Sequence, residues 1–232
     1  MNIEELKCAL QNGARQETAR LISRHFAERR CVEGAVGDIL RVLSFCPPEE
    51  RIYLLRQSIQ HAPRETALYV ELVRHQLQQQ EYEQAEWWWG IAIKIGARSA
   101  ALWALGVDVA LGRYDLQLAE TAMDRFSQLA PEDTKTLARL KASHAYAKGV
   151  ELWQTNKRDQ ALFWIRRAIV DAPHWEEPRL TLADYLNELG RPNSAIKYAH
   201  STPSSGIPTL RSISPTSPTH AVIVPIECAE IS

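Results

Sequence analysis

Histidine and carboxylate side chains, which most often carry chemistry in enzymes, follow no spacing that catalysis or metal binding requires. The seven histidines form no H-E-x-x-H segment and no i, i+4 pair with a further ligand, so no metal site is expected. Adjacent carboxylates such as Glu49–Glu50 and Glu176–Glu177 point to different sides of a helix. They are typical of helix starts, where the helix dipole favours negative charge, and we do not expect them to act as an acid–base pair.

The cysteines and glycines lead to the same expectation. The four cysteines, Cys8, Cys31, Cys46 and Cys228, lie far apart and form no C-x-x-C pair, so free thiols are expected. None of the ten glycines lies in a phosphate-binding loop or a nucleophile elbow. The sequence therefore predicts a protein that is not an enzyme and uses no cofactor and no metal.

Charge and hydropathy narrow the classes of partner. The 232 residues include 27 basic and 28 acidic side chains, whereas a nucleic-acid-binding protein needs a strong basic excess. No apolar run approaches the roughly 20 residues of a membrane-spanning helix, so membrane insertion is not expected. The first residues are acidic where a secretory signal would be basic, which favours a cytoplasmic location.

The elements that position these side chains follow an internal repeat. Alanines near the start of helix-like segments recur at a fixed interval: Ala85 and Ala119 are 34 residues apart, and so are Ala161 and Ala195. Pro63 and Pro131 are separated by 68 residues, which is twice that period. A small residue here, and another seven residues later, lets a neighbouring helix approach closely, and the proline ends the unit.

This pattern resembles the tetratricopeptide (TPR) repeat family, whose 34-residue unit is a pair of antiparallel helices with the pattern W-x2-L-G-x2-Y, A-x3-F and P. Matches occur in four successive units: Leu72, Ala85, Trp89 and Ala92; Trp103, Ala119 and Pro131; Gly149, Ala161, Ala168 and Pro173; Leu182 and Ala195. Two positions depart from it, since Ala97 replaces the closing proline and Phe126 replaces a small residue. The resemblance implies an all-α fold, a right-handed α-solenoid of antiparallel helix pairs.

The repeat sets the expected domain boundaries. Residues 1–65 are predicted to hold N-terminal helices over about 2–13, 14–30, 34–45 and 49–61, the first capped by Asn2 and Glu5 and the last two forming a degenerate repeat. TPR-like repeats are expected at 66–99, 100–133, 142–175 and, incomplete, at 176–200. Ala119 and Ala161 are 42 residues apart, eight more than the period. A first helix longer by eight residues is favoured over an inserted loop, because 133–154 contains no proline and few turn formers.

The segment 201–232 is rich in serine, threonine and proline, and we expect it to be a disordered C-terminal tail. It interrupts the last helix, which suggests a frameshifted or truncated end; alternatively, the apolar residues 221–226 fold back as a cap. Deleting 201–232 is expected to leave thermal stability almost unchanged.

The resemblance implies that the first helices line a concave groove that binds a peptide or a helix. The candidate partner-binding residues carried over from the family's groove positions are Val70, Arg74, Leu77, Gln78, Asp108, Leu111, Tyr146, Val150, Trp153, Asp184 and Asn187, with Ala104 and Leu180 at two further positions. Only Arg74 fits the family's carboxylate clamp, so a co-chaperone of that kind is disfavoured.

The run Trp87-Trp88-Trp89 is the most unusual feature. Three consecutive indoles spread over most of a helix face, so they cannot all enter one interface. Trp89 matches the aromatic core position of the pattern. Packing of Trp87 and Trp88 against adjacent units is favoured; in the alternative, one of them is exposed and anchors a partner.

The function predicted from these observations is a non-enzymatic scaffold or adaptor for a protein or peptide partner. Two alternatives stay open. One is a secretion or assembly chaperone, which would form a homodimer through its N-terminal helices. The other is the truncated TPR portion of a larger enzyme, such as a glycosyltransferase.

Overall fold

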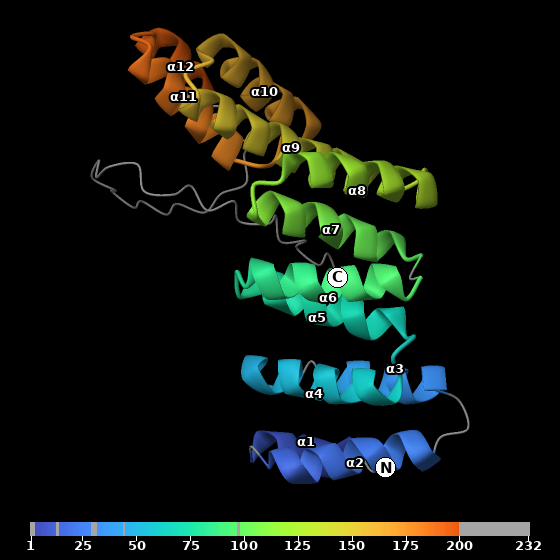
Figure 1. The fold of residues 1–232 in the computed structure, drawn as a ribbon. Helices are drawn as coiled ribbons and strands as arrows, with labels where there is room; N and C mark the ends of the chain where they lie inside the picture. Colours follow the sequence, from blue (N-terminus) through green and yellow to red (C-terminus); the bar gives the residue numbers. More distant parts are fainter. Residues whose placement is uncertain (1–2, 13, 29–31, 44, 97, 200–232) are drawn as a thin grey trace. The chain divides into compact units, whose positions relative to one another are not determined.

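The computed structural model describes residues 3–12, 14–28, 32–43, 45–96 and 98–199, and within these ranges every regular element is an α-helix (Figure 1). The predictions for Asn2, Cys31, Ala97, Cys228 and the tail 201–232 concern residues outside these ranges. The twelve helices are α1 (Ile3–Gln11), α2 (Arg15–Glu28), α3 (Val32–Leu43), α4 (Pro48–His61), α5 (Thr66–Gln78), α6 (Tyr82–Lys94), α7 (Ala100–Gly112), α8 (Leu116–Leu129), α9 (Thr134–Gln154), α10 (Arg158–Asp171), α11 (Glu177–Glu188) and α12 (Pro192–Ala199).

The all-α fold predicted from the sequence is confirmed. By their internal contacts the described residues fall into two compact units, which divide between Val109 and Ala110 within α7. We call α5, α7, α9 and α11 the first helices and α6, α8, α10 and α12 the second helices of their pairs. No helix within the described ranges has the length and apolar character needed to cross a membrane.

Each first helix ends in the same left-handed turn. Gln80, Tyr114, Asn156 and Gly190 have φ of 59°, 60°, 61° and 70°. The next residue donates its backbone N–H to the carbonyl five positions earlier, as Glu81 does to Gln76 and Arg191 to Leu186, each at 2.9 Å. This is the Schellman motif, which satisfies carbonyl groups at the end of a helix. The left-handed residues are separated by the same intervals as the repeat alanines. The repeat is therefore visible in the backbone conformation as well as in the sequence.

Small residues let neighbouring helices approach closely, both within a pair and between one pair and the next. Ala85, Ala119 and Ala161 are fully buried. A Cβ added at Gly106 would lie 2.6 Å from the indole of Trp89, and one added at Gly149 would lie 2.6 Å from Ile165 Cδ1. The close contact places the Trp89 indole where its Nε1 donates to the Leu102 carbonyl at 3.0 Å. The core role predicted for Trp89 is thus confirmed.

The longer first helix predicted from the 42-residue interval is also confirmed. Helix α9 has 21 residues, whereas α5 and α7 have 13 each, a difference of eight. The added residues lie toward the start of α9, because the left-handed Asn156 still precedes Ala161 by five residues, as Gln80 precedes Ala85. Asp133 caps this start by accepting a hydrogen bond from the Thr136 N–H at 3.0 Å.

The N-terminal helices α1 to α4 lie close to the predicted ranges. Their core contains fully buried aliphatic side chains, including Leu6, Ile22, Ile39 and Leu54. Helix α4 ends as α8 and α10 do: Ala62, Ala130 and Ala172 have φ of −134°, −137° and −136°, and a proline follows each. The end of α4 therefore shares the backbone geometry that closes the later pairs, although α4 lacks their alanine pattern.

Candidate partner-binding surfaces

The groove residues predicted from the sequence divide into buried and exposed side chains. The buried ones are Val70, Leu77, Asp108, Leu111, Tyr146, Val150 and Trp153. The exposed ones are Arg74, Gln78, Asp184 and Asn187. A buried side chain offers little area to another protein, so the four exposed residues are the ones in direct reach of a partner. The binding role of all eleven stays a prediction.

Tyr146 and Trp153 connect α9 to α11. The Trp153 ring stacks on Tyr185 with a centroid distance of 3.7 Å and an interplanar angle of 1°, and the Arg158 guanidinium lies 3.9 Å from the Trp153 centroid. The Tyr146 hydroxyl donates to Glu177 Oε1 at 3.2 Å, and it lies 3.1 Å from the Thr181 hydroxyl. Burial raises the pKa of Tyr185 to about 12, so its hydroxyl is protonated at neutral pH. These contacts hold the helices of the second unit together.

Helix α11 carries an exposed stripe made of Leu180, Asp184 and Asn187, which we call the α11 stripe. Their spacing of four and three residues places them on one side of the helix. The Leu180 side chain is 54% exposed although it is apolar. Leu182, Ala183 and Leu186 are buried in the core of this unit, so the stripe is not needed to pack α11. Desolvation raises the pKa of the Asp184 carboxyl, which means that its charge is incompletely hydrated.

On the first unit, the exposed groove positions of α5 are Arg74 and Gln78. The Arg74 guanidinium is already paired with the carboxylate of Glu71 on the same helix. This part of the predicted groove therefore presents an ion pair and an amide rather than an unpaired charge.

A hollow of about 550 Å³ lies between α4 and α6 in the first unit, and we call it the α4–α6 hollow. Its lining residues are Arg56, Ile59, Gln60, Glu83, Gln84, Trp87 and Trp88. The Trp87 indole is 59% exposed and stands edge-on to Trp88, with ring centroids 4.5 Å apart. Trp88 is half-buried and lies 6.2 Å from the Tyr69 ring. Of the two tryptophans, Trp88 therefore packs on its neighbours, whereas Trp87 faces solvent.

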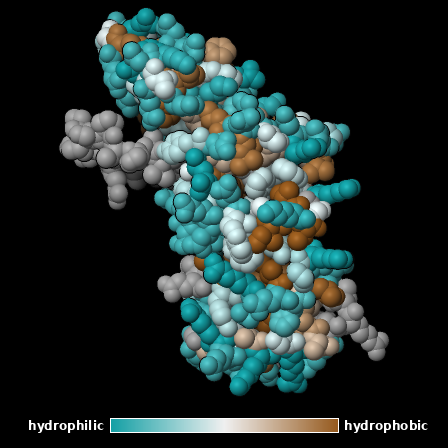
Figure 2. Space-filling view, in the orientation of Figure 1, coloured by the Kyte–Doolittle hydropathy of each residue, from teal (hydrophilic) through white to brown (hydrophobic). Residues whose placement is uncertain are grey.

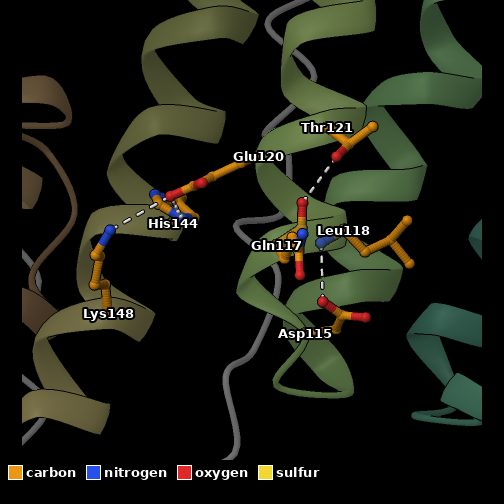
Figure 3. Close-up of polar contacts among 7 residues, drawn as sticks. All are labelled: Asp115, Gln117, Leu118, Glu120, Thr121, His144 and Lys148. Atoms are coloured by element: carbon orange, nitrogen blue, oxygen red, sulfur yellow. Dashed lines mark hydrogen bonds and ion pairs between the residues drawn. The ribbon is translucent and has the colours of Figure 1, made fainter.

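The second unit has a hollow of about 460 Å³ beside α8, α9 and α10, the α8–α10 hollow. Phe163, 62% exposed, stands edge-on to Trp164 at 5.7 Å, and the Lys148 ammonium lies 4.6 Å from the Trp164 centroid. Figure 3 shows Glu120 between two basic groups: its Oε1 lies 3.3 Å from His144 Nε2 and 3.4 Å from Lys148 Nζ. His144 is buried, and burial lowers its pKa, opposed by Glu120 and assisted by Lys148. The neutral imidazole is thus favoured.

The aromatic pairs that line the two hollows occupy the same two positions of the repeat. Trp87 and Trp88 follow Ala85 by two and three residues, and Phe163 and Trp164 follow Ala161 by the same steps. Sequence reasoning singled out Trp87 and Trp88 but missed Phe163, for which this register was the available signal. On the face drawn in Figure 2, exposed apolar side chains (brown) gather in patches among hydrophilic ones (teal). Such patches are the usual sites of protein–protein contact.

Among the described residues, metal-ligating and thiol side chains can be compared with the requirements of their chemistry. No group of three or more His, Cys, Asp and Glu side chains among them is arranged to hold a metal ion. Of the cysteines, Cys8 and Cys46 are free thiols, and burial raises the pKa of Cys46 to about 11, which makes it a poor nucleophile.

Helix pairs with a 34-residue period, small residues at their contacts and a left-handed turn after each first helix define the fold as tetratricopeptide-like. No model of a known protein family matches the chain, and no curated protein does. Among solved structures, MamA from Desulfovibrio magneticus RS-1, residues 41 to end, is similar with a TM-score of 0.53 and 14% identity over 72% of this chain and 90% of that chain. BtubC from P. vanneervenii is similar with a TM-score of 0.52 and 15% identity, over 92% of this chain and 100% of that chain. YrrB, described as a TPR protein with an unusual peptide-binding site, has a TM-score of 0.42 and 14% identity, over 84% of this chain and 89% of that chain. At these identities the likeness to MamA and BtubC concerns the fold, and it agrees with the repeat read from the sequence.

Proposed function

We propose that this protein is a non-catalytic scaffold that binds a peptide or helix of another protein along the exposed faces of its first helices. The observation that carries the proposal is the α11 stripe, because Leu180, Asp184 and Asn187 share one face and do no packing work in the core. Arg74 and Gln78 are the corresponding candidates on α5. The chaperone and enzyme-fragment interpretations stay predictions from the sequence.

The chemistry of the stripe indicates what the partner segment contains. Burial of the Leu180 side chain beneath an apolar side chain of the partner would be favourable, because it removes apolar surface from water. The Asp184 carboxylate lacks full hydration, so a nearby cation on the partner would stabilise its charged form. The Asn187 amide can both donate and accept hydrogen bonds. A partner segment with an apolar anchor and a lysine or arginine one turn away fits this stripe.

Tyr146 and Trp153 are among the predicted groove residues, but their contacts with α11 make them unsuitable for testing partner capture. Replacing either by alanine would remove packing that positions the stripe, so lost binding and lost stability could not be separated. The test must use exposed residues whose replacement leaves the fold intact.

The experiment places the photo-crosslinking amino acid p-benzoylphenylalanine at Leu180 in the full chain and, as a control, at Val170, which is exposed on the second helix α10. Covalent adducts with one defined protein are expected at position 180 and not at position 170. Charge reversal by Asp184→Lys should abolish the adduct, while Glu132→Lys, an exposed reversal in the same unit, should leave it unchanged. Equal adducts at 170 and 180, or an adduct insensitive to Asp184→Lys, would refute the proposal.

A further inference from the structure

We infer that the α4–α6 hollow is a second docking site, separate from the first-helix faces, and that it binds an amphipathic helix of a partner protein. In this arrangement an apolar side chain of the partner helix rests against Trp87. A carboxylate one helical turn away on the partner helix pairs with Arg56.

Trp87 has the properties of a binding hot spot. Its indole is 59% exposed, yet it is supported edge-on by Trp88, which is itself held against Tyr69. Tryptophan contributes a large apolar area with few rotatable bonds, and a supported ring loses little further freedom on binding. Ile59, which is almost completely buried, also lines the hollow, so the lining beside Trp87 is partly apolar. The hollow is therefore prepared for an apolar side chain.

Arg56 supplies the charge that selects the partner. Its Nη2 donates to Gln84 Oε1 at 3.0 Å, and its guanidinium lies 5.9 Å from the Trp88 centroid. The same Gln84 oxygen accepts from Gln76 Nε2 at 3.2 Å, which fixes the bridge between α4 and α6. Among the described residues, no carboxylate pairs with Arg56. The guanidinium keeps unused donors in a defined position, and a carboxylate is the group that matches them best.

The walls of the hollow favour a helix over an extended peptide. An extended segment needs partners for its backbone amides, usually at the edge of a sheet, and the described part of the chain contains no strand. A helix satisfies its own backbone groups and presents side chains one turn apart. The walls have the same spacing, with Arg56 and Gln60 on α4 facing Glu83 and Trp87 on α6.

The α8–α10 hollow provides a natural control. It has an aromatic pair at the same register, but the cation over its tryptophan, Lys148, already lies 3.4 Å from the Glu120 carboxylate. The exposed aromatic residue Phe163 therefore matches Trp87 in exposure, while the cation over its neighbour Trp164 is already paired with a carboxylate. Phe163→Ala is accordingly the matched control for Trp87→Ala.

The experiment uses a displayed library of one alanine-rich helical host peptide, in which an apolar position and the positions three and four residues from it are randomised. The library is selected against the full chain and against the Trp87→Ala, Arg56→Glu, Arg56→Lys and Phe163→Ala variants. We expect enrichment of aromatic or aliphatic anchors with Asp or Glu one turn away. Arg56→Glu should instead enrich Lys or Arg, and Arg56→Lys should keep the acidic preference.

Binding of an enriched synthetic peptide is then measured by fluorescence anisotropy. Trp87→Ala should weaken affinity by at least about thirtyfold, as expected for a hot spot. Trp87→Phe should restore most of it, and Phe163→Ala should change it less than about threefold. Circular dichroism confirms that the variants fold. Absence of enrichment, enrichment of proline-containing peptides, or equal binding by Trp87→Ala would overturn the inference. Because crosslinking at position 180 should be unaffected by Trp87→Ala, this inference can fail while the proposed function stands.

Discussion

The glycine at position 149 shows how closely the helices of a pair approach. A Cβ there would meet Ile165 Cδ1 at 2.6 Å and the Ile165 backbone nitrogen at 3.2 Å, so the Ile165 side chain must move and the backbone beside it must yield slightly. Gly149→Ala is expected to lower the free energy of unfolding by about 1–3 kcal/mol through overpacking. Urea denaturation followed by circular dichroism measures this change.

The matched control is Gly90→Ala in α6, where nothing lies within 4 Å of the added Cβ. Alanine should there raise stability by roughly 0.5–1 kcal/mol, because it favours the helix. Changes of the same sign at both positions would show that contact with Ile165 is not what requires glycine at 149.

The burial of His144 predicts a pH dependence. Burial is the largest influence and lowers the pKa of His144, Glu120 from α8 raises it, and Lys148 lowers it; Trp164 from α10 adds no charge. The folded-state pKa of His144 therefore lies below its unfolded value of about 6.5. Keeping this imidazole neutral in the core contributes stability that is fully present above about pH 6.5 and is lost as the pH falls. The wild type should therefore lose more thermal stability between pH 7.5 and 5 than His144→Gln. Thermal unfolding at several pH values in this range measures the loss. If the unfolding temperatures of the two proteins differed by the same amount at every pH, His144 would not be the source of the pH dependence.

At the scale of the elements, the sequence predicted what depends on regular spacing. The 42-residue interval indicated a first helix longer by eight residues, and α9 has that length. The left-handed turns were not predicted, since only Gly190 carries the glycine that signals one, whereas Gln80, Tyr114 and Asn156 adopt the same φ without that signal. Here the hydrogen bonds of the turn outweigh the intrinsic preference of the residue.

The candidate site was predictable only in part, because a sequence pattern does not determine how side chains from different helices pack together. A repeat pattern assigns each position to a helix face, but it does not say which side chains the next helix covers. Tyr146 and Trp153 lie at groove positions, yet the side chains of α11 cover them. For Trp87, the favoured expectation was packing, and its exposure follows from Trp88 taking the space beside Tyr69.

At the scale of the whole molecule, a repeat array is stabilised by contacts between neighbouring elements rather than by one central core. In the second unit, α9 contacts α8 and α10, and α11 contacts α10 and α12. Gly149→Ala should therefore increase amide hydrogen exchange in α9, α10 and α11 while leaving α1 to α3 unchanged. Hydrogen exchange followed by mass spectrometry measures this pattern. A uniform increase along the chain would instead indicate a single cooperative unit.

The left-handed corner after each first helix has a consequence for recombination. In all four pairs it has the same backbone hydrogen bonds, and the same five residues separate it from the alanine of the second helix. A chimeric chain can thus join the first helix of one pair to the second helix of another with an identical junction. Exchange of genetic segments at this corner would alter the side chains that a repeat displays while keeping the path of its backbone.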